Sequence, residues 1–277
     1  MKIIKTISEM AELRKTLTEP VGFVPTMGYL HEGHISLVRR AKEENASVIV
    51  SIFVNPTQFG PNEDYGNYPC DIDGDLEILK EEGVDVIFAP EADEIYPKDF
   101  NSRVEVIGIT QKLEGNCRPG HFRGVTTIVN KLFNIAAPNR AYFGQKDAQQ
   151  AIVINKMVKD LNMNLEIITC PTIREPDGLA MSSRNVYLRA EDRQSATVLY
   201  RSLMLAKDLY ERGERNAENI RKEMVNLIKT EEMARIDYVS VADPVTLDEL
   251  DEISGKALVS LAVKLYKTRL IDNVVLG

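Results

Sequence analysis

Short apolar runs rich in β-branched residues alternate with amphipathic stretches through the first two thirds of the chain, and this alternation constrains the fold more than any other feature. Five runs are typical of buried strands: residues 21–25, 47–54, 84–89, 141–143 and 165–169. Four intervening stretches have helical apolar spacing: residues 36–44, 74–82, 125–136 and 148–161. The pattern predicts an α/β fold with a doubly wound, mostly parallel, Rossmann-like sheet. Such sheets bind ligands beyond the carboxyl ends of their strands.

The pattern changes after about residue 176. Two amphipathic helices are predicted at residues 190–212 and 217–229, followed by strand-like runs at residues 236–242, 257–265 and 269–276. We therefore expect a second, smaller α/β C-terminal domain, joined through the turn at residues 174–178. The predicted division is residues 1–176 for the larger domain and residues 177–277 for the smaller one.

Composition restricts the partners and the compartment. The chain has 277 residues and a formal charge of −8, from 34 basic and 42 acidic side chains. This balance disfavours nucleic acid or an anionic membrane as the main partner. No signal peptide and no membrane-spanning run is visible, so a cytoplasmic protein is expected. Cys70, Cys117 and Cys170 lack disulfide or zinc-ribbon spacing, and buried, reduced thiols are expected.

The first predicted strand runs into a glycine-punctuated helix start that carries His31 and His34. Unpaired N–H groups and the helix dipole stabilise phosphate oxygens at such a position. Gly28 and Gly33 allow close approach of a ligand, and residues three apart on a helix share a face. Two alternatives stay open: an ordinary turn with solvated histidines, or a His-x-x-His metal site, although no Cys or carboxylate stands at useful spacing.

Other strand ends carry amides and charges. Asn55 and Gln58 follow the second strand in a loop bounded by proline and glycine, where amides can bind a hydroxyl and a carboxylate, unless the loop is a plain turn. Lys146 and Asp147 stand at a predicted helix start, with Gln150 one turn further on. Lysine suits a phosphate, and the alternative for Asp147 is that it serves simply as a helix cap.

Two loops offer further anion-binding groups. Residues 181–185 combine hydroxyls with one guanidinium, which suits a polyphosphate or belongs to an ordinary surface loop. Arg118, His121 and Arg123 lie in a turn-rich segment at residues 113–124, where a fork of arginines could hold a carboxylate or phosphate, or remain solvated. The acidic residues at 71, 73 and 75 favour helix capping and solubility over magnesium binding.

Six segments together resemble one known family in order and almost end to end: residues 25–34, 51–60, 118–124, 142–147, 174–185 and 268–273. The family is that of the pantothenate synthetases (pantoate–β-alanine ligases). It belongs to the nucleotidyltransferases related to class I aminoacyl-tRNA synthetases, in which a His-x-Gly-His turn and a mobile basic loop hold ATP. The resemblance implies ATP-dependent condensation of (R)-pantoate with β-alanine through pantoyl adenylate, releasing pyrophosphate and AMP, with Mg²⁺ accompanying ATP. It also implies a homodimer.

The resemblance implies roles for individual residues. An ATP site would consist of Met27, Gly28, Tyr29, Leu30, His31, Glu32, Gly33 and His34; Gly144, Gln145, Lys146 and Asp147; and Ile173, Met181, Ser182, Ser183 and Arg184. Within this set, His34, His31 and Lys146 would be catalytic. Pantoate and β-alanine would be bound by Gln58 and Gln150, with Asn55 assisting. Metal ligands remain unassigned.

One departure concerns Tyr266 and Lys267, which stand where the family pattern often has a glycine before residues 268–273. Two other functions remain as alternatives. A nucleotidyltransferase acting on a phosphorylated alcohol would need a strongly basic second pocket near Asn55 and Gln58, which the sequence lacks. If the chain were a non-catalytic nucleotide-binding module, replacing His34 would change no chemical activity.

Overall fold

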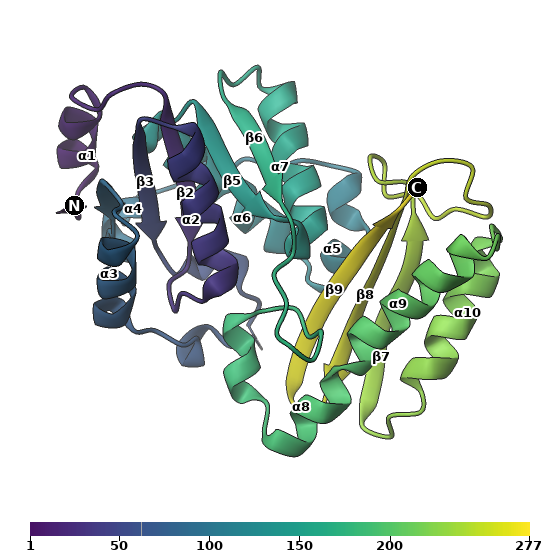
Figure 1. Ribbon diagram of the computed structural model, residues 1–277. Coiled ribbons are helices and arrows are strands. Elements are labelled where there is room, and N and C mark those ends of the chain that lie inside the picture. The colour runs from purple at the N-terminus through teal and green to yellow at the C-terminus, as the bar shows by residue number, and fades with distance from the viewer. Residues whose placement is uncertain (62) are drawn as a thin grey trace.

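A six-stranded parallel sheet lies at the centre of the larger part of the molecule (Figure 1). The computed structural model describes residues 1–61 and 63–277. The strand order is β1-β4-β3-β2-β5-β6, and every neighbouring pair is parallel. The strands are β1 (Lys2–Ile4), β2 (Val21–Thr26), β3 (Ser47–Ile52), β4 (Val86–Phe88), β5 (Arg140–Gly144) and β6 (Glu166–Cys170). The predicted parallel, Rossmann-like sheet is confirmed.

The chain builds outward from β2 in two directions. β3 and β4 extend the sheet on one side of β2, whereas β5 and β6 extend it on the other. The reversal places a topological switch point between the carboxyl ends of β2 and β5. Open α/β sheets bind their ligands at such points, because the loops that leave the two strands diverge there and open a crevice.

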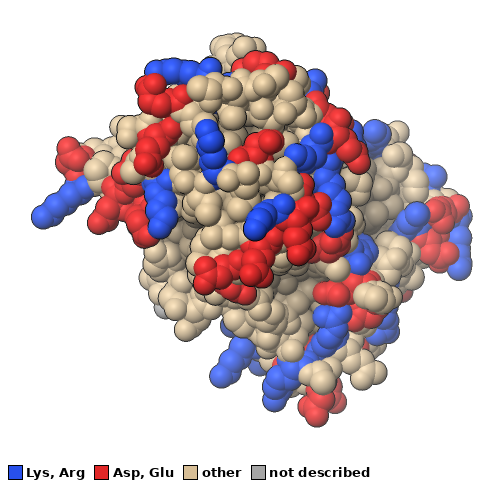
Figure 2. Space-filling view, turned by 60° about the vertical axis from the view of Figure 1, so that its left-hand side comes forward, with Lys and Arg blue, Asp and Glu red and all other residues tan. Residues whose placement is uncertain are grey.

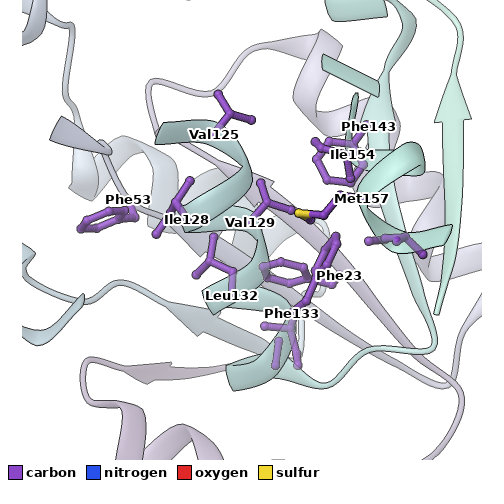
Figure 3. Close-up of a cluster of buried hydrophobic side chains, with 14 of the residues drawn as sticks. Phe23, Phe53, Val125, Ile128, Val129, Leu132, Phe133, Phe143, Ile154 and Met157 are labelled. Carbon is purple, nitrogen blue, oxygen red and sulfur yellow. The ribbon is translucent and has the colours of Figure 1, made fainter. Parts of the chain in front are cut away.

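Helices cover both faces of this sheet. One face packs against α2 and α3 through a core that includes Val24 and Val50. The other face packs against α1, α6 and α7, where Figure 3 shows Phe23, Phe133 and Met157 gathered in one core. Successive residues of a strand point to opposite faces, so Phe23 and Val24 contribute to different cores. The helices are α1 (Ile7–Arg14), α2 (Glu32–Glu44), α3 (Ile72–Glu81), α4 (Ala92–Ile95), α5 (Glu114–Cys117), α6 (His121–Ala136) and α7 (Ala148–Asp160).

The C-terminal part has its own antiparallel sheet and its own core. Its strand order is β7-β8-β9, and α9 and α10 lie along it, as Figure 1 shows in green and yellow. Leu203, Ile220 and Leu261 belong to its apolar cluster. The elements are α8 (Ala190–Ala196), α9 (Val198–Glu211), α10 (Ala217–Ile228), β7 (Ala234–Ala242), β8 (Ala257–Leu265) and β9 (Thr268–Leu276). The predicted smaller α/β unit is therefore present.

The departure at Tyr266 lies in the turn between β8 and β9. Leu265 pairs with Thr268, so Tyr266 and Lys267 form a two-residue hairpin loop. Tyr266 has a φ of 53°, in the left-handed region that glycine adopts without steric cost. A glycine in this loop would relieve that strain, and the substitution affects the hairpin tip rather than the body of the sheet.

Several predicted boundaries were wrong. The single helix predicted at residues 190–212 is divided into α8 and α9. The loop predicted at residues 113–124 contains α5 and the start of α6, whose first residue, His121, follows Gly120 at a φ of 85° without a side-chain cap. Lacking a capping side chain, this helix start carried little local signal.

The N-terminal β1 and α1 were not predicted. α1 begins with a capping box, in which Glu9 N donates to Thr6 Oγ1 and Thr6 N donates to Glu9 Oε2, both at 3.2 Å. The Thr-x-x-Glu spacing is a helix-start signal and would have revealed this element. Short 3₁₀ helices complete the secondary structure: η1 (Pro56–Gln58), η2 (Tyr65–Asn67), η3 (Ile109–Gln111), η4 (Gln145–Asp147) and η5 (Ser183–Tyr187).

Surface charge, helix apolarity and thiol burial test three expectations that were drawn from composition. Figure 2 shows basic and acidic side chains interspersed across the face that it presents. Within residues 1–61 and 63–277, no helix has the length and apolarity needed to cross a bilayer. Cys70, Cys117 and Cys170 are free thiols, but only Cys170 is buried, so the expectation of buried thiols was wrong for the other two.

Candidate active site

A cavity of about 220 Å³ lies at the switch point between β2 and β5. The ends of both strands contribute to its wall, with Met27 following β2 and Gly144 ending β5. Predicted residues from four parts of the chain line it: Met27, His31, Gly33, His34, Asn55, Gln58, Gly144, Lys146, Asp147, Gln150, Ile173, Met181, Ser182, Ser183 and Arg184. The predicted convergence of strand ends on one crevice is confirmed.

A buried carboxylate shapes the turn that leaves β2. Asp75 of α3 accepts hydrogen bonds from Tyr29 N at 2.8 Å and Leu30 N at 2.7 Å. Gly28 and Tyr29 have φ values of 80° and 53°, and the two bonds to Asp75 hold this left-handed stretch in place. Burial raises the pKa of the Asp75 carboxyl despite these two bonds. Only Asp71 acts as the helix cap expected of the acidic cluster, by accepting from Gly74 N at 3.1 Å.

His31 and His34 are oriented by the helix start itself. His31 Nδ1 accepts from Gly33 N at 3.1 Å, and His34 Nδ1 accepts from His31 N at 3.4 Å, which forms a capping box with imidazoles in place of hydroxyl and carboxylate. A neutral imidazole that accepts at Nδ1 carries its proton on Nε2. Both rings therefore present Nε2–H donors.

Both histidines are held neutral. Burial, reinforced by the Lys146 charge, lowers the pKa of His31 to about 4. Burial also lowers the pKa of His34 to about 3, with further contributions from His31 and Lys146. An uncharged N–H can donate a hydrogen bond to a phosphate oxygen at neutral pH, whereas proton donation would first require protonation of the ring.

The η4 turn after β5 brings Lys146 and Asp147 to the same cavity. Lys146 Nζ lies 3.7 Å from Asp147 Oδ1, and Gln150, one turn along, also lines the wall. The Asp147 side chain makes no capping hydrogen bond at the start of α7, so the alternative role of a helix cap is not realised. The turn therefore presents one ammonium, one carboxylate and one amide to the cavity.

The hydroxyl-rich segment after β6 lies against the histidine turn. Ser183 Oγ donates to Tyr29 O at 3.2 Å. Arg184 forms a two-point ion pair with Asp64, at 2.9 and 2.8 Å, and its guanidinium stands 5.6 Å from the centre of the Tyr68 ring. The guanidinium is thus occupied by Asp64 in this structure, and its planar fork is the kind of group that binds a carboxylate or a phosphate at two points.

The amide loop after β3 has one structural and one available amide. Asn55 is 1% exposed and donates to Gln58 Oε1 at 3.0 Å and to Gly124 O at 3.2 Å, while its oxygen accepts from Tyr96 OH at 2.8 Å. The nitrogen of Gln58 has a sulfur contact, at 3.1 Å from Met27 Sδ. Sulfur is a weak acceptor, so Gln58 keeps donor capacity for a ligand.

The predicted fork of arginines is absent among the described residues. Arg118 lines the cavity but pairs with Glu63, at 2.7 and 2.6 Å, and it donates to His121 Nε2 at 3.1 Å. His121 Nδ1 lies 2.8 Å from Gln58 O, which can only accept, so the ring is neutral with its proton on Nδ1. Burial lowers the pKa of His121 to about 4, and the charge of Arg118 adds to the effect. Arg123 is exposed on α6.

Some predicted residues lie outside the cavity wall, and some wall residues were not predicted. Gly28, Tyr29 and Leu30 shape the turn behind the histidines, Glu32 pairs with Arg39 on the surface, and Gln145 contacts the C-terminal sheet. The unpredicted part of the wall is mainly apolar: Phe53, Tyr68, Val125, Ile128, Val129 and Leu132. The apolar stripe of α6 was visible in the sequence, but nothing local distinguishes residues that line a cavity from residues that fill a core.

The described residues give the cavity no dedicated metal cage. Within the described part of the chain, no three His, Cys, Asp or Glu side chains are grouped so as to hold an ion. Asp147 contributes a carboxylate to the wall. Mg²⁺ commonly binds through one or two carboxylates together with substrate phosphates, so this donor set fits an ion that arrives with a nucleotide.

The fold and the cavity define an α/β enzyme whose site lies at the carboxyl edge of a parallel sheet. The family model described as Pantoate-beta-alanine ligase matches residues 2–275. A pantothenate synthetase from Acetivibrio thermocellus is 59% identical over 278 residues, which cover 99% of both chains. The chain belongs to the pantoate–β-alanine ligase family.

Solved structures agree with this assignment. The pantothenate synthetase from Thermus thermophilus superimposes with a TM-score of 0.95 at 46% identity, covering 99% of each chain. A pantoate–β-alanine ligase from Francisella tularensis, solved in complex with β-γ ATP and β-alanine, has a TM-score of 0.81 at 41% identity, covering 99% of this chain and 97% of that one.

Proposed function

We propose that this cavity condenses (R)-pantoate with β-alanine at the expense of ATP, giving pantothenate, AMP and pyrophosphate. One observation carries the proposal: the His31–His34 turn, the Lys146 turn and the Ser182–Arg184 segment meet in a single cavity with an amide-bearing loop. Family membership supports the overall reaction, and the Francisella ligase, solved with an ATP ligand and β-alanine, supports these two substrate classes.

The nucleotide would occupy the polar side of the cavity. The Nε2–H groups of His31 and His34 would donate to phosphate oxygens, and Lys146 would supply a positive charge. Arg184 would exchange Asp64 for the outer phosphates, while Ser182 and Ser183 contribute hydroxyl donors. Asp147 would bind the ribose or complete the coordination of Mg²⁺. When bound, Mg²⁺ neutralises phosphate charge and orients the triphosphate.

The acid substrate would lie between the amides and the apolar wall. Pantoate carries a carboxylate, two hydroxyls and two methyl groups on one carbon. Gln58 and Gln150 provide donors and acceptors for the polar groups, whereas Val129 and Leu132 of α6 provide an apolar surface for the methyls. Asn55 would act indirectly, because its own hydrogen bonds are used within the loop.

The reaction would proceed in two displacements. A pantoate carboxylate oxygen attacks the α-phosphorus of ATP, and pyrophosphate leaves, which forms pantoyl adenylate. The β-alanine amine then attacks the acyl carbon and AMP leaves, while the amine loses its proton. Attack of one anion on another requires charge neutralisation and alignment, which the neutral donors and the cations around the triphosphate would supply.

Four further assignments belong to this proposal. The division into domains at residues 1–176 and 177–277 is supported by separate apolar cores. Magnesium is supported by the donor set described above. The homodimer rests on the family resemblance. The cytoplasmic location keeps the expectation drawn from the sequence, in which no signal peptide is visible, and free thiols are compatible with a reducing compartment. Sedimentation of the purified protein would test the dimer.

Exchange of radiolabelled pyrophosphate into ATP tests the function. We expect exchange that depends on pantoate, and AMP release that additionally requires β-alanine. Exchange without dependence on an acid, or transfer of AMP to a phosphorylated alcohol, would favour a nucleotidyltransferase. Binding of ATP without exchange would favour a non-catalytic module.

A further inference from the structure

Two adjacent side chains of β9 reach from the C-terminal sheet to two different segments of the proposed nucleotide site. Asp272 and Asn273 are buried, with 2% and 4% exposure. Neighbouring residues of a strand point to opposite faces, so each has its own partners. None of the roles discussed above uses either residue, although both lie within the segment that resembles the family.

Asn273 is bonded to the backbone of the turn that carries Lys146. Its Nδ2 donates to Gln145 O and to Lys146 O, both at 2.9 Å, and its Oδ1 accepts from Gln145 Nε2 at 2.9 Å. A side-chain amide has two N–H donors, and both are used here. The position of the Lys146 backbone is therefore set by a residue of another sheet.

Asp272 holds the segment that leads to Arg184. Its two oxygens accept from Arg174 Nη1 at 2.5 Å and Arg174 Nη2 at 3.0 Å. Arg174 begins a short hairpin, since it pairs with Ala180 and its Nη1 also donates to Gly178 O at 3.1 Å. This hairpin continues directly into residues 181–184, which line the cavity.

We propose that Asn273 is a positioning residue for Lys146, and that with Asp272 it makes β9 a common support that sets the spacing between the Lys146 turn and the Ser182–Arg184 segment. The inference rests on the proposed function, because both segments are there assigned to one triphosphate. A polyphosphate bound by two segments requires them at a fixed separation. Misplacement of a binding group by about 1 Å can cost about 100-fold in rate.

The matched control is Ser260→Ala. Ser260 is the cross-strand partner of Asn273, is 6% exposed, and its Oγ has no hydrogen-bond partner among the described residues. Its replacement changes the packing beside Asn273 and removes no hydrogen bond to the described part of the Lys146 turn. We expect this control to stay within about twofold of the wild type, because removal of an unpartnered hydroxyl costs little.

The test variants are Asn273→Ala and Asn273→Ser, assayed by pantoate-dependent pyrophosphate exchange. We expect kcat/KM for ATP to fall about 10- to 100-fold in both, with a smaller change in KM for pantoate. Circular dichroism melts identify any variant that fails to fold, and the serine variant, which leaves a smaller void than a full truncation to alanine, keeps the test available in that case.

Histidine titration by NMR separates positioning from a general loss of stability. The chain has three histidines. If Lys146 moves away from the histidines in the Asn273 variants, the pKa values of His31 and His34 rise toward the ordinary value, because repulsion by its charge weakens. The pKa of His121, which Lys146 does not affect, stays where it is. A purely structural role for Asn273 would lower the melting temperature and leave these titrations unchanged.

Asn273→Asp adds a test by pH. Its ionised carboxylate would face two carbonyl oxygens, whereas the protonated carboxyl supplies an O–H donor. The activity of this variant, relative to wild type, should therefore rise as pH is lowered. Asn273 variants that match Ser260→Ala in kinetics and titration would overturn the inference while leaving the function intact. Absence of pantoate-dependent exchange in the wild type would instead remove the function itself.

Discussion

The imidazole rings of His31 and His34 lie with their centroids 4.1 Å apart and their planes inclined by 35°. Each Nδ1 accepts a backbone N–H from the same helix start, so neither ring can turn away without losing a capping bond. The turn therefore presents two fixed, neutral donors side by side. Such an arrangement suits stabilisation of charge on phosphate oxygens, because the donors are oriented before the substrate binds.

Replacing His34 tests this interpretation directly. We expect His34→Ala to lower kcat for pantoate-dependent exchange by about 10²- to 10³-fold, or about 2.7–4 kcal/mol, as for loss of one preorganised donor. His34→Asn retains an N–H donor on a shorter side chain and should recover part of the rate. Steady-state kinetics of both variants provide the measurement, and an unchanged rate in the alanine variant would remove His34 from the mechanism.

Gly33→Ala should disturb His31 without weakening the helix. A Cβ at residue 33 would stand 2.8 Å from His31 Cε1 and 2.9 Å from His31 Nδ1, so the ring must move. Alanine is a better helix former than glycine by about 1 kcal/mol, which offsets the cost of losing the His31 capping bond, so the melting temperature should change little. We expect kcat/KM for ATP to drop about 10- to 100-fold. Gly255→Ala, where a Cβ meets nothing within 4 Å, is the control.

Gly124→Ala should act on the other side of the cavity. The alanine Cβ would lie 2.3 Å from Thr57 O and 2.7 Å from Gln58 Cα. Because these are backbone atoms, the clash can be relieved only if η1 moves. We expect pantoate to bind at least about 10-fold more weakly while ATP binding changes little, because the amide loop shifts and the nucleotide segments do not. Calorimetric titration with each substrate measures the two effects, and equal weakening of both would contradict the assignment of Gln58.

Stability should fall as the pH is lowered from neutral. Burial places the pKa values of His31, His34 and His121 at about 4, 3 and 4, below the ordinary value of 6.5. The unfolded chain therefore binds more protons than the folded one below pH 6.5. The stabilisation from keeping these rings neutral is complete above that pH and is lost as the pH falls toward the folded values.

His121→Gln isolates one of these contributions. A glutamine amide can still donate to Gln58 O and accept from Arg118, but it does not titrate. We expect the unfolding free energy of this variant, from urea denaturation, to depend less steeply on pH between 6.5 and 4, by up to about 1.4 kcal/mol per pH unit. An unchanged slope would mean that His121 is not held neutral in the folded protein.

The segments that bear charge and amides were predicted from the sequence because their signals are local. A strand followed by glycines and His31, or by Lys146 and Asp147, is recognisable within a few residues. The pairing of Arg118 with Glu63, which replaces the predicted arginine fork, was not. Neither was the apolar wall from α6, because residues such as Val129 have the same periodicity whether they face a cavity or a core.

The sequence by itself determined the alternation of strands and helices, the two-unit organisation and the orientation of His31 and His34 on one helix turn, since periodicity and capping act between residues a few positions apart. Only the tertiary structure decided which strand ends meet, that Asp75 braces the histidine turn, and that Asn273 supports Lys146. These contacts join residues far apart along the chain, and they form only when the sheets and helices pack together as one molecule.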